Sequence, residues 1–253
     1  AGAGTTDGSI LLQAGGNITE GGSGGLKGDL NGKLLGYSLG GKILLDTTAN
    51  NAMATAAFKT DTAAGTNGTV TYFDSTALTI GTVANAGTLI APSTTAASTV
   101  GPLSGITTVA GTTNGAVVVQ SGGLLTVDQA ILTTPAAAGI GGSVILEATT
   151  GGITTSNLGT ITTTGNGADA GGEVFLHNST TGAITIGQAV TAKGGSGGNG
   201  GVVTVLNSAA AGAAIPGTIA VNAVIDVSLA GAGTPAGSIL LQAGGNITEG
   251  GSG

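Results

Sequence analysis

The sequence predicts an all-β protein that winds as a parallel β-helix, or β-solenoid, of about eight coils with roughly 29 residues per coil. Two features predict this fold: an apolar run follows a glycine at loosely regular intervals, and the chain ends on a near copy of its own beginning. Composition agrees, because 52 glycines, 40% hydrophobic residues and only 2% aromatic residues require a core of small and β-branched side chains.

The long repeat is read directly from the two ends of the chain. The stretch GSILLQAGGNITEGGSG begins at Gly8 and returns at Gly237, and with its flanks residues 1–24 match residues 230–253 at 22 of 24 positions. We therefore interpret 1–229 as one complete long repeat and the remainder as the start of the next copy, in a chain cut from a longer one.

A shorter period lies inside the long repeat, and each period opens with a glycine and an apolar run. These openings are GSILLQ at Gly8, GKILLD at Gly41, GTVTYF at Gly68, GTLIAP at Gly87, GAVVVQ at Gly115, GSVILE at Gly142, GEVFLH at Gly172, GVVTVL at Gly201 and GSILLQ at Gly237. The step of 19 residues that ends at Gly87 is the weakest, and GTLIAP could belong to a longer preceding coil.

Most periods continue with a turn of small residues, a second short apolar run such as GLLTV or GAITI, and often a third such as GTITTTG or AVIDVSL. Three β-rich segments per period, with no helix-forming run, are typical of a parallel β-solenoid. A single coil cannot bury its apolar side, so coils stack and strand ladders run between them.

Side chains alternate between the two faces of a strand, which assigns the first run of each period. The second and fourth residues after the glycine are apolar throughout and are expected to face the core: Ile10/Leu12, Ile43/Leu45, Val70/Tyr72, Leu89/Ala91, Val117/Val119, Val144/Leu146, Val174/Leu176, Val203/Val205 and Ile239/Leu241. Polar residues around them are expected to face solvent: Lys42, Asp46, Glu147, Glu173, His177 and Asn207.

The third residue of each run is also expected to point outward, yet seven of these nine residues are apolar. They form a candidate stripe for lateral packing: Leu11, Leu44, Ile90, Val118, Ile145, Phe175 and Leu240. A neighbouring fibre or another partner would cover such a stripe. The alternatives are coverage by the chain's own long segments (25–40, 48–66 or 208–216), tolerated exposure of valine, or an error in the assigned register.

Charge and composition exclude several functions. The chain has five lysines, no arginine and a net charge of −7, so it lacks the basic surface that would bind nucleic acid. The absence of cysteine excludes disulfides and thiolate metal sites. Polar residues or glycine interrupt every apolar run before it reaches the roughly 18–20 residues of a transmembrane helix. No signal peptide opens the chain, as expected of a fragment that begins inside a repeat.

Residues that could carry chemistry are scattered. His177 is the only histidine, no motif surrounds any serine, and the acids occur singly, so we expect no enzyme, no cofactor and no metal site. The segment GGSGGNGG at Gly194 lacks the aspartate of calcium-binding solenoid repeats. Residues 25–75 form the most charged and least regular segment, which could be a decorated loop or a binding patch; its charged residues include Lys27, Asp29, Lys33, Lys42, Asp46, Lys59, Asp61 and Asp74.

Two further patterns have simple interpretations. Thr19, Thr79, Thr126, Thr154 and Thr185 share one position of the second run and would stack as an outward ladder, which fits either a solvated β-face or an ice-binding face. Glycosylation of Asn-x-Ser/Thr stays open, since matches at this frequency are expected by chance in so Thr-rich a chain; they begin at Asn17, Asn67, Asn178 and Asn246.

The stretches GGSVILEATTGGITTSNLGTITTTG and GGEVFLHNSTTGAITIGQAVTAKGGSGGNGGVVTVLN resemble the repeat region of filamentous-haemagglutinin-like exoproteins, the large secreted β-helical proteins of bacteria. The resemblance covers most of residues 114–253 and, more weakly, residues 8–113. It implies a right-handed parallel β-helix, export through the outer membrane and a surface fibre that acts in adhesion or cell contact. The chain shows no match to that family's secretion domain.

The function we expect is therefore structural: a segment of an extracellular or cell-surface fibre whose strand ladders continue between copies of the 229-residue repeat. The partners would be further copies end to end and, laterally, neighbouring fibres. The alternative is an adhesin module in which residues 25–75 or the apolar stripe contact a host surface, a glycan or a neighbouring cell. An enzyme on a β-helix scaffold is a third hypothesis, which the lack of a carboxylate cluster opposes.

Overall fold

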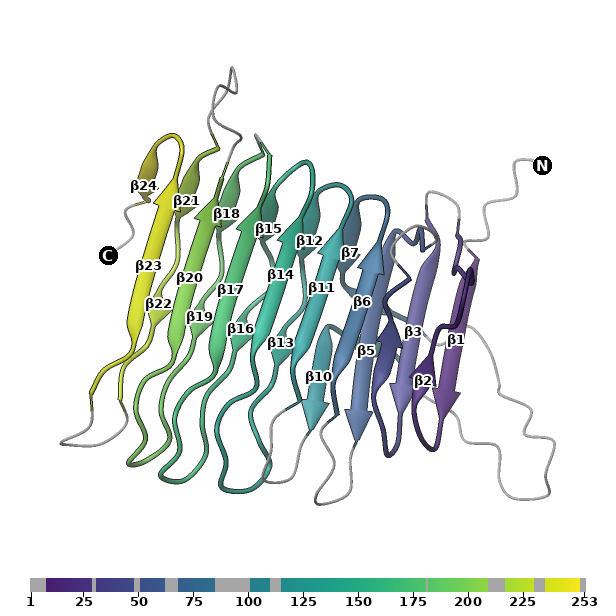
Figure 1. Cartoon of the computed structure of the whole chain (residues 1–253), viewed down its shortest axis with the longest axis horizontal. Helices are drawn as coiled ribbons and strands as arrows, with labels where there is room; N and C mark the ends of the chain where they lie inside the picture. Colours follow the sequence, from purple (N-terminus) through teal and green to yellow (C-terminus); the bar gives the residue numbers. More distant parts are fainter. Residues whose placement is uncertain are drawn as a thin grey trace.

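The computed structural model describes residues 8–28, 31–47, 51–61, 68–84, 101–109, 115–180, 182–208, 217–229 and 235–250. Every regular element in these residues is a β-strand, which confirms the all-β prediction. Figure 1 shows the strands side by side along the long axis of the molecule. The strands of its two large sheets pair in parallel, an arrangement consistent with a β-solenoid.

One wall of the molecule is an eight-stranded sheet, seen at the front of Figure 1. Its order is β2 (Ile18–Thr19), β4 (Ile43–Leu45), β6 (Val70–Asp74), β11 (Val117–Ser121), β14 (Val144–Ala148), β17 (Glu173–Asn178), β20 (Val202–Asn207) and β23 (Ser238–Ala243). From β4 to β23 these strands are the predicted first runs of the periods.

A curled sheet of 14 strands forms the rest. One arm of it consists of second runs: β7 (Leu78–Ile80), β12 (Leu125–Val127), β15 (Ile153–Thr155), β18 (Ile184–Ile186), β21 (Ile219–Val221) and β24 (Ile247–Glu249). The other arm consists largely of third runs: β10 (Ile106–Val109), β13 (Ile131–Leu132), β16 (Ile161–Thr162), β19 (Val190–Thr191) and β22 (Ile225–Asp226).

The two arms of the curled sheet meet at one long strand, β5 (Thr55–Asp61). Its first residues pair with β7 and its last four pair with β10. On its other edge β5 pairs with β3 (Lys33–Ser38), which pairs in turn with β1 (Ser9–Ala14). The N-terminal part therefore uses single long strands where the C-terminal part uses separate second and third runs.

Strand pairing follows the predicted period, with one exception. In the eight-stranded sheet Val144 pairs with Val174 and Val174 with Val203, as the aligned glycine openings predict. However, Val70 pairs directly with Val117, so no strand from GTLIAP lies between them. The predicted opening at Gly87, with Leu89 and Ala91, lies outside the described residues, and the run from Gly68 to Gly115 makes one ladder step rather than two.

The hydrophobic core fills the space between the two sheets and confirms the predicted inward positions from Ile43/Leu45 to Val203/Val205, apart from Leu89/Ala91, which lie outside the described residues; the pairs Ile10/Leu12 and Ile239/Leu241 at the two ends are only partly covered. Side chains of the eight-stranded sheet such as Val144 and Leu146 are fully buried, as are Ile153 and Ile161 of the curled sheet opposite them. The aromatic pair Phe58 and Tyr72, with ring centroids 5.1 Å apart, occupies the N-terminal part of this core. Most of this core consists of aliphatic side chains from both sheets, and aromatic side chains contribute little to it.

Glycine and threonine together form the corner where each third run turns into the next first run. A Cβ added to Gly172 would lie 2.4 Å from the carbonyl oxygen of Gly142, one step earlier, so only glycine allows the approach. The buried hydroxyl of Thr163 donates to the Gly172 carbonyl at 3.4 Å, and that of Thr133 donates to the Gly142 carbonyl at 2.7 Å. This close approach explains the glycine openings from Gly115 to Gly237, whereas nothing lies within 4 Å of a Cβ added to Gly8.

The opposite corner carries a buried polar column that corrects one prediction. Asn207 was expected to face solvent, but it is fully buried, because as the sixth residue after its glycine it shares the inward face of Val203 and Val205. Asp74, Ser121, Ala148 and Asn178 share its register. The threonine ladder forms in part: Thr79, Thr126, Thr154 and Thr185 stack in the curled sheet, whereas Thr19 lies in the eight-stranded sheet.

Candidate functional site

The outer face of the eight-stranded sheet carries most of the predicted apolar stripe. Val118, Ile145 and Phe175 pair in register on adjacent strands and are half-buried. Leu44 lies on the same row beyond Thr71, and Leu240 beyond Thr204. Leu240 is the most open of these, with 54% of its surface exposed. Ile90 lies outside the described residues.

Leu11 does not lie on this row. Its strand β1 belongs to the curled sheet, where Leu11 pairs with Leu35. Leu11 packs there against a small second cluster of buried residues, Leu35, Ala57 and Val83, with Leu103 beside it. Val83 and Leu103 come from the antiparallel pair β8 (Thr82–Val83) and β9 (Leu103–Ser104). At this end the chain therefore covers its own outward apolar side chains.

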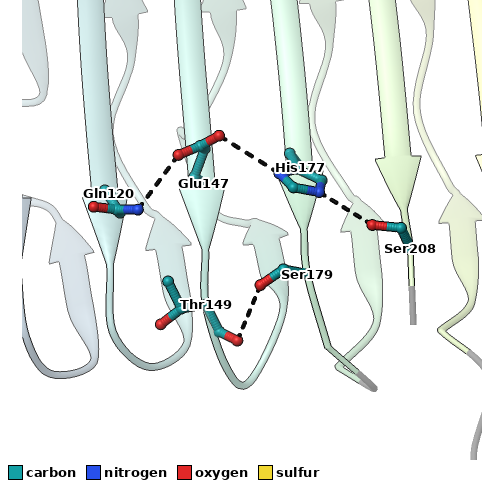
Figure 2. A network of polar contacts seen from close by, with 6 residues as sticks. All are labelled: Gln120, Glu147, Thr149, His177, Ser179 and Ser208. Carbon is teal, nitrogen blue, oxygen red and sulfur yellow. Dashed lines mark hydrogen bonds and ion pairs between the residues drawn. The ribbon is translucent and has the colours of Figure 1, made fainter. Parts of the chain in front are cut away.

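A row of polar side chains crosses three strands beside the stripe (Figure 2). Gln120 on β11 donates to Glu147 on β14 at 3.4 Å, and Glu147 lies 3.5 Å from Nδ1 of His177 on β17. The Nε2 atom of His177 hydrogen-bonds with Ser208, just after β20, at 3.1 Å. His177 also lies against Phe175, with ring centroids 5.7 Å apart.

The order serine, histidine, carboxylate matches that of the catalytic relay of serine hydrolases, so its chemistry must be considered. Catalysis also needs free backbone N–H groups that stabilise an oxyanion. The backbone N–H of Ser208 instead donates to the carbonyl of Asn178 at 3.1 Å, and the His177–Glu147 separation of 3.5 Å exceeds that of an ordinary hydrogen bond. The row is therefore best described as cross-strand pairing on a partly solvated face.

This polar row was missed by sequence reasoning, which treated His177 as an isolated surface residue. The signal was available, because aligning the openings at Gly172 and Gly201 places His177 opposite Leu206 and close to Ser208. The same alignment places Glu147 opposite His177. In a stacked structure, residues about one period apart are neighbours, so scattered residues still form rows.

Charged residues of the 25–75 segment are engaged in structural contacts. Lys59 forms an ion pair with Asp61 at 3.0 Å, and the Tyr37 hydroxyl donates to the same carboxylate. That hydrogen bond to Asp61 raises the pKa of Tyr37 to about 12. Asp74 is buried and accepts hydrogen bonds from the Tyr72 hydroxyl at 2.6 Å and the backbone N–H of Met53 at 2.8 Å.

The remaining charged residues of that segment have varied surroundings. Lys42 and Asp46 are exposed, and Lys27 pairs in parallel with Ala52 in an isolated bridge. Asp29 lies outside the described residues. An apolar hollow close to these segments is lined in part by Met53, Leu78 and Leu124. Within the described residues no three histidine, aspartate or glutamate side chains gather as metal ligands.

The C-terminal end of the two sheets exposes core positions. Ile239 on β23 is 44% exposed and Ile247 on β24 is 47% exposed, whereas Val203 and Ile219, one step earlier on the same ladders, are fully buried. These side chains line an open apolar hollow together with Val221, Ile225 and Leu241. Both β23 and β24 are terminal strands in their sheets, so each presents an unpaired edge.

No family model, curated protein or solved structure matches the chain. The described residues contain no helix that is long and apolar enough to span a membrane. The described part offers partners the outer face of the eight-stranded sheet and the apolar end at β23 and β24, and its strands β1 and β2 also have one unpaired edge each.

Proposed function

We propose that the chain is a structural segment of an extracellular or cell-surface fibre, built as a continuous parallel β-solenoid from copies of the 229-residue repeat. The handedness would be right-handed, as for nearly all parallel crossover connections. The resemblance to filamentous-haemagglutinin-like exoproteins supports the extracellular location. The strength of such a fibre would come from strand ladders and a core that continue from coil to coil.

One observation carries this proposal: the end of the core at β23 and β24 is open. Ile239 and Ile247 are 44% and 47% exposed at positions that are fully buried one step earlier. Exposed apolar side chains beside unpaired strand edges favour addition of further strands. The sequence is consistent with a matching partner, because residues 230–253 repeat the beginning of the chain, as they would at the start of a further copy.

Cryo-electron microscopy of the native assembly tests the fibre. We expect a layer spacing of about 4.8 Å, the distance between neighbouring strands. The eight-stranded sheet has seven steps from β2 to β23, so we expect an axial repeat of about 34–38 Å per copy. Discrete globular particles with neither spacing would contradict the proposal.

The second candidate function is an adhesive or lateral-packing surface on the outer face of the eight-stranded sheet. The observation in its favour is the row of half-buried apolar side chains Val118, Ile145 and Phe175 beside a polar row. Deleting residues 25–75 would not test it cleanly, because Leu34, Ile43 and other residues of that segment belong to the core.

A surface substitution is a sharper test of this candidate. Ile145→Ser removes an apolar side chain from the outer face without touching the core, and Thr154→Ser on the curled sheet is a matched control. We expect loss of fibre bundling or of cell attachment only in Ile145→Ser, with fibres still forming. Equal bundling and attachment in both variants would exclude this surface as the contact.

A further inference from the structure

The repeated stretch adopts the same local structure in both copies but pairs on opposite edges. Residues 9–14 and 238–243 each form a six-residue strand, and each is followed by a bend and a short second strand. The first copy pairs forward, β1 with β3 and β2 with β4. The second copy pairs backward, β23 with β20 and β24 with β21. A single segment could therefore make both sets of pairings at once.

The two copies also lie in opposite sheets. In the first copy SILLQA belongs to the curled sheet and the following Ile18–Thr19 to the eight-stranded sheet. In the second copy SILLQA belongs to the eight-stranded sheet and Ile247–Glu249 to the curled sheet. Figure 1 shows the consequence: β1 points across the long axis in the direction opposite to β23, although their sequences are identical.

We propose that residues 237–250 join one copy to the next as a shared coil, so that the eight-stranded sheet of one copy continues into the curled sheet of the following copy. This inference rests on the proposed fibre. The partner that covers the open end at β23 and β24 is the following copy of this chain's own repeat. In that following copy, strand β23 takes the place that β1 has in this structure. Successive copies are then related by a rotation about the fibre axis. This rotation places the curled sheet of one copy on the side where the preceding copy has its eight-stranded sheet.

The exposed side chains of the shared coil match this arrangement. Leu11, which is equivalent to Leu240, packs against Leu35 in the small cluster near β8 and β9. At the junction the exposed Leu240 would enter the same cluster of the next copy. Ile18, equivalent to the exposed Ile247, pairs with Ile43.

Polar side chains of the repeated stretch are also bonded in the first copy and exposed in the second. The Glu20 carboxylate accepts hydrogen bonds from the Asn51 side chain at 3.0 Å and the backbone N–H of Thr47 at 3.2 Å. The side-chain oxygen of Asn17 accepts from the backbone N–H of Lys42 at 2.9 Å. The equivalents in the second copy, Asn246 and Glu249, are exposed. They would make these hydrogen bonds to the next copy.

The rotation follows from the number of ladder steps in one repeat. Strand β2 reaches β23 after seven steps of one sheet, but the repeated unit begins earlier, at β1 on the opposite wall. One repeat therefore holds seven full coils and part of another. Features that recur once per repeat, such as the row Val118, Ile145 and Phe175, would face alternate sides of the fibre.

Helical reconstruction of native fibres of the full-length protein tests the inference. We expect each axial repeat to be accompanied by a large rotation that brings the curled sheet to the side where the eight-stranded sheet was. An axial repeat with a rotation near zero would overturn the shared coil and leave the fibre proposal standing. Absence of any axial repeat would overturn both.

A pair of variants tests the same junction without imaging. The first variant is Leu240→Lys, introduced in the full-length protein at a junction between two copies of the repeat. It would place a charge in the cluster that covers Leu11 in this structure. Leu158→Lys is the matched control, because Leu158 is 66% exposed and lies away from the junction.

We expect both substitutions to leave the 253-residue chain folded, and only Leu240→Lys to lower the thermal midpoint of the full-length fibre. A junction without rotation would keep Leu240 on the open outer face, and the two variants would then show equal midpoints. That equality would overturn the inference.

Discussion

The side-chain amide of Asn178 donates a hydrogen bond to the side-chain oxygen of Asn207 across strands β17 and β20, at 3.1 Å, with both residues fully buried. The amide nitrogen of Asn207 in turn donates to the carbonyl oxygens of Gly182 and Thr218, each at 2.8 Å. This pair closes the corner between the first and second runs. It adds side-chain donors to buried backbone carbonyls of the turn: Gly182 accepts from both asparagines, and Thr218 accepts from Asn207 as well as from the backbone N–H of Ile184.

Replacing Asn207 by alanine should destabilise the chain. The substitution removes three buried side-chain hydrogen bonds, the one that Asn207 accepts from Asn178 and the two that it donates to Gly182 and Thr218, although Gly182 still accepts from Asn178 and Thr218 still accepts from the backbone N–H of Ile184. Their net loss costs about 1–3 kcal/mol in the free energy of unfolding. Urea unfolding followed by circular dichroism measures the change. Asn246→Ala is the control, because Asn246 is exposed in this chain, and its effect should stay within about 0.5 kcal/mol. Equal stability of the two variants would contradict the structural role of the buried pair.

Replacing Gly172 by alanine should also destabilise the chain, for a steric reason. The new Cβ would lie 2.4 Å from the carbonyl oxygen of Gly142 and 2.5 Å from that of Gly141, and only a backbone shift could relieve the contact. Such overpacking costs about 1–3 kcal/mol. Gly16→Ala is the matched control, since nothing lies within 4 Å of its added Cβ. A thermal midpoint of Gly172→Ala that matches the control would show that the corner can widen freely.

The inward columns of the core were predictable because the two-residue alternation of a strand needs only the position of the opening glycine. Val144 and Leu146 follow this rule directly. The buried Asn207 obeys the same alternation, and the prediction failed because polarity was allowed to outweigh position. Burial is tolerated there because neighbouring carbonyls accept its amide hydrogens.

The placement of β1 could not be predicted from its own sequence. Leu11 and Leu240 have identical neighbours along the chain, yet one lies in the curled sheet and the other in the eight-stranded sheet. The strand that pairs with each copy decides its sheet, and this information lies in residues 33–38 and 202–207 rather than in the repeat. The polar row of His177 likewise depends on pairing between distant runs.

Titration of the two tyrosines gives a pH-dependent test of the N-terminal part. The hydrogen bond to Asp61 raises the pKa of Tyr37 to about 12, and burial, with the neighbouring Asp74, raises the pKa of Tyr72 further. Both values exceed the ordinary value of about 10, so the folded state favours the protonated phenols. Their contribution to stability is complete below about pH 10 and is lost as the pH rises through the folded-state values.

We therefore expect tyrosinate absorbance to stay low at pH 10 in the folded chain, to rise for Tyr37 near pH 12, and to rise for Tyr72 only with unfolding. Asp61→Asn removes the charged acceptor and should bring the pKa of Tyr37 back toward the ordinary value of about 10 while leaving Tyr72 unchanged. Ionisation of both phenols near pH 10 in the native chain would show that neither the hydrogen bond of Tyr37 to Asp61 nor the burial of Tyr72 persists in solution. The Asp61 variant thus distinguishes the half-buried tyrosine of the small cluster from the fully buried tyrosine of the main core, because only the first depends on that carboxylate.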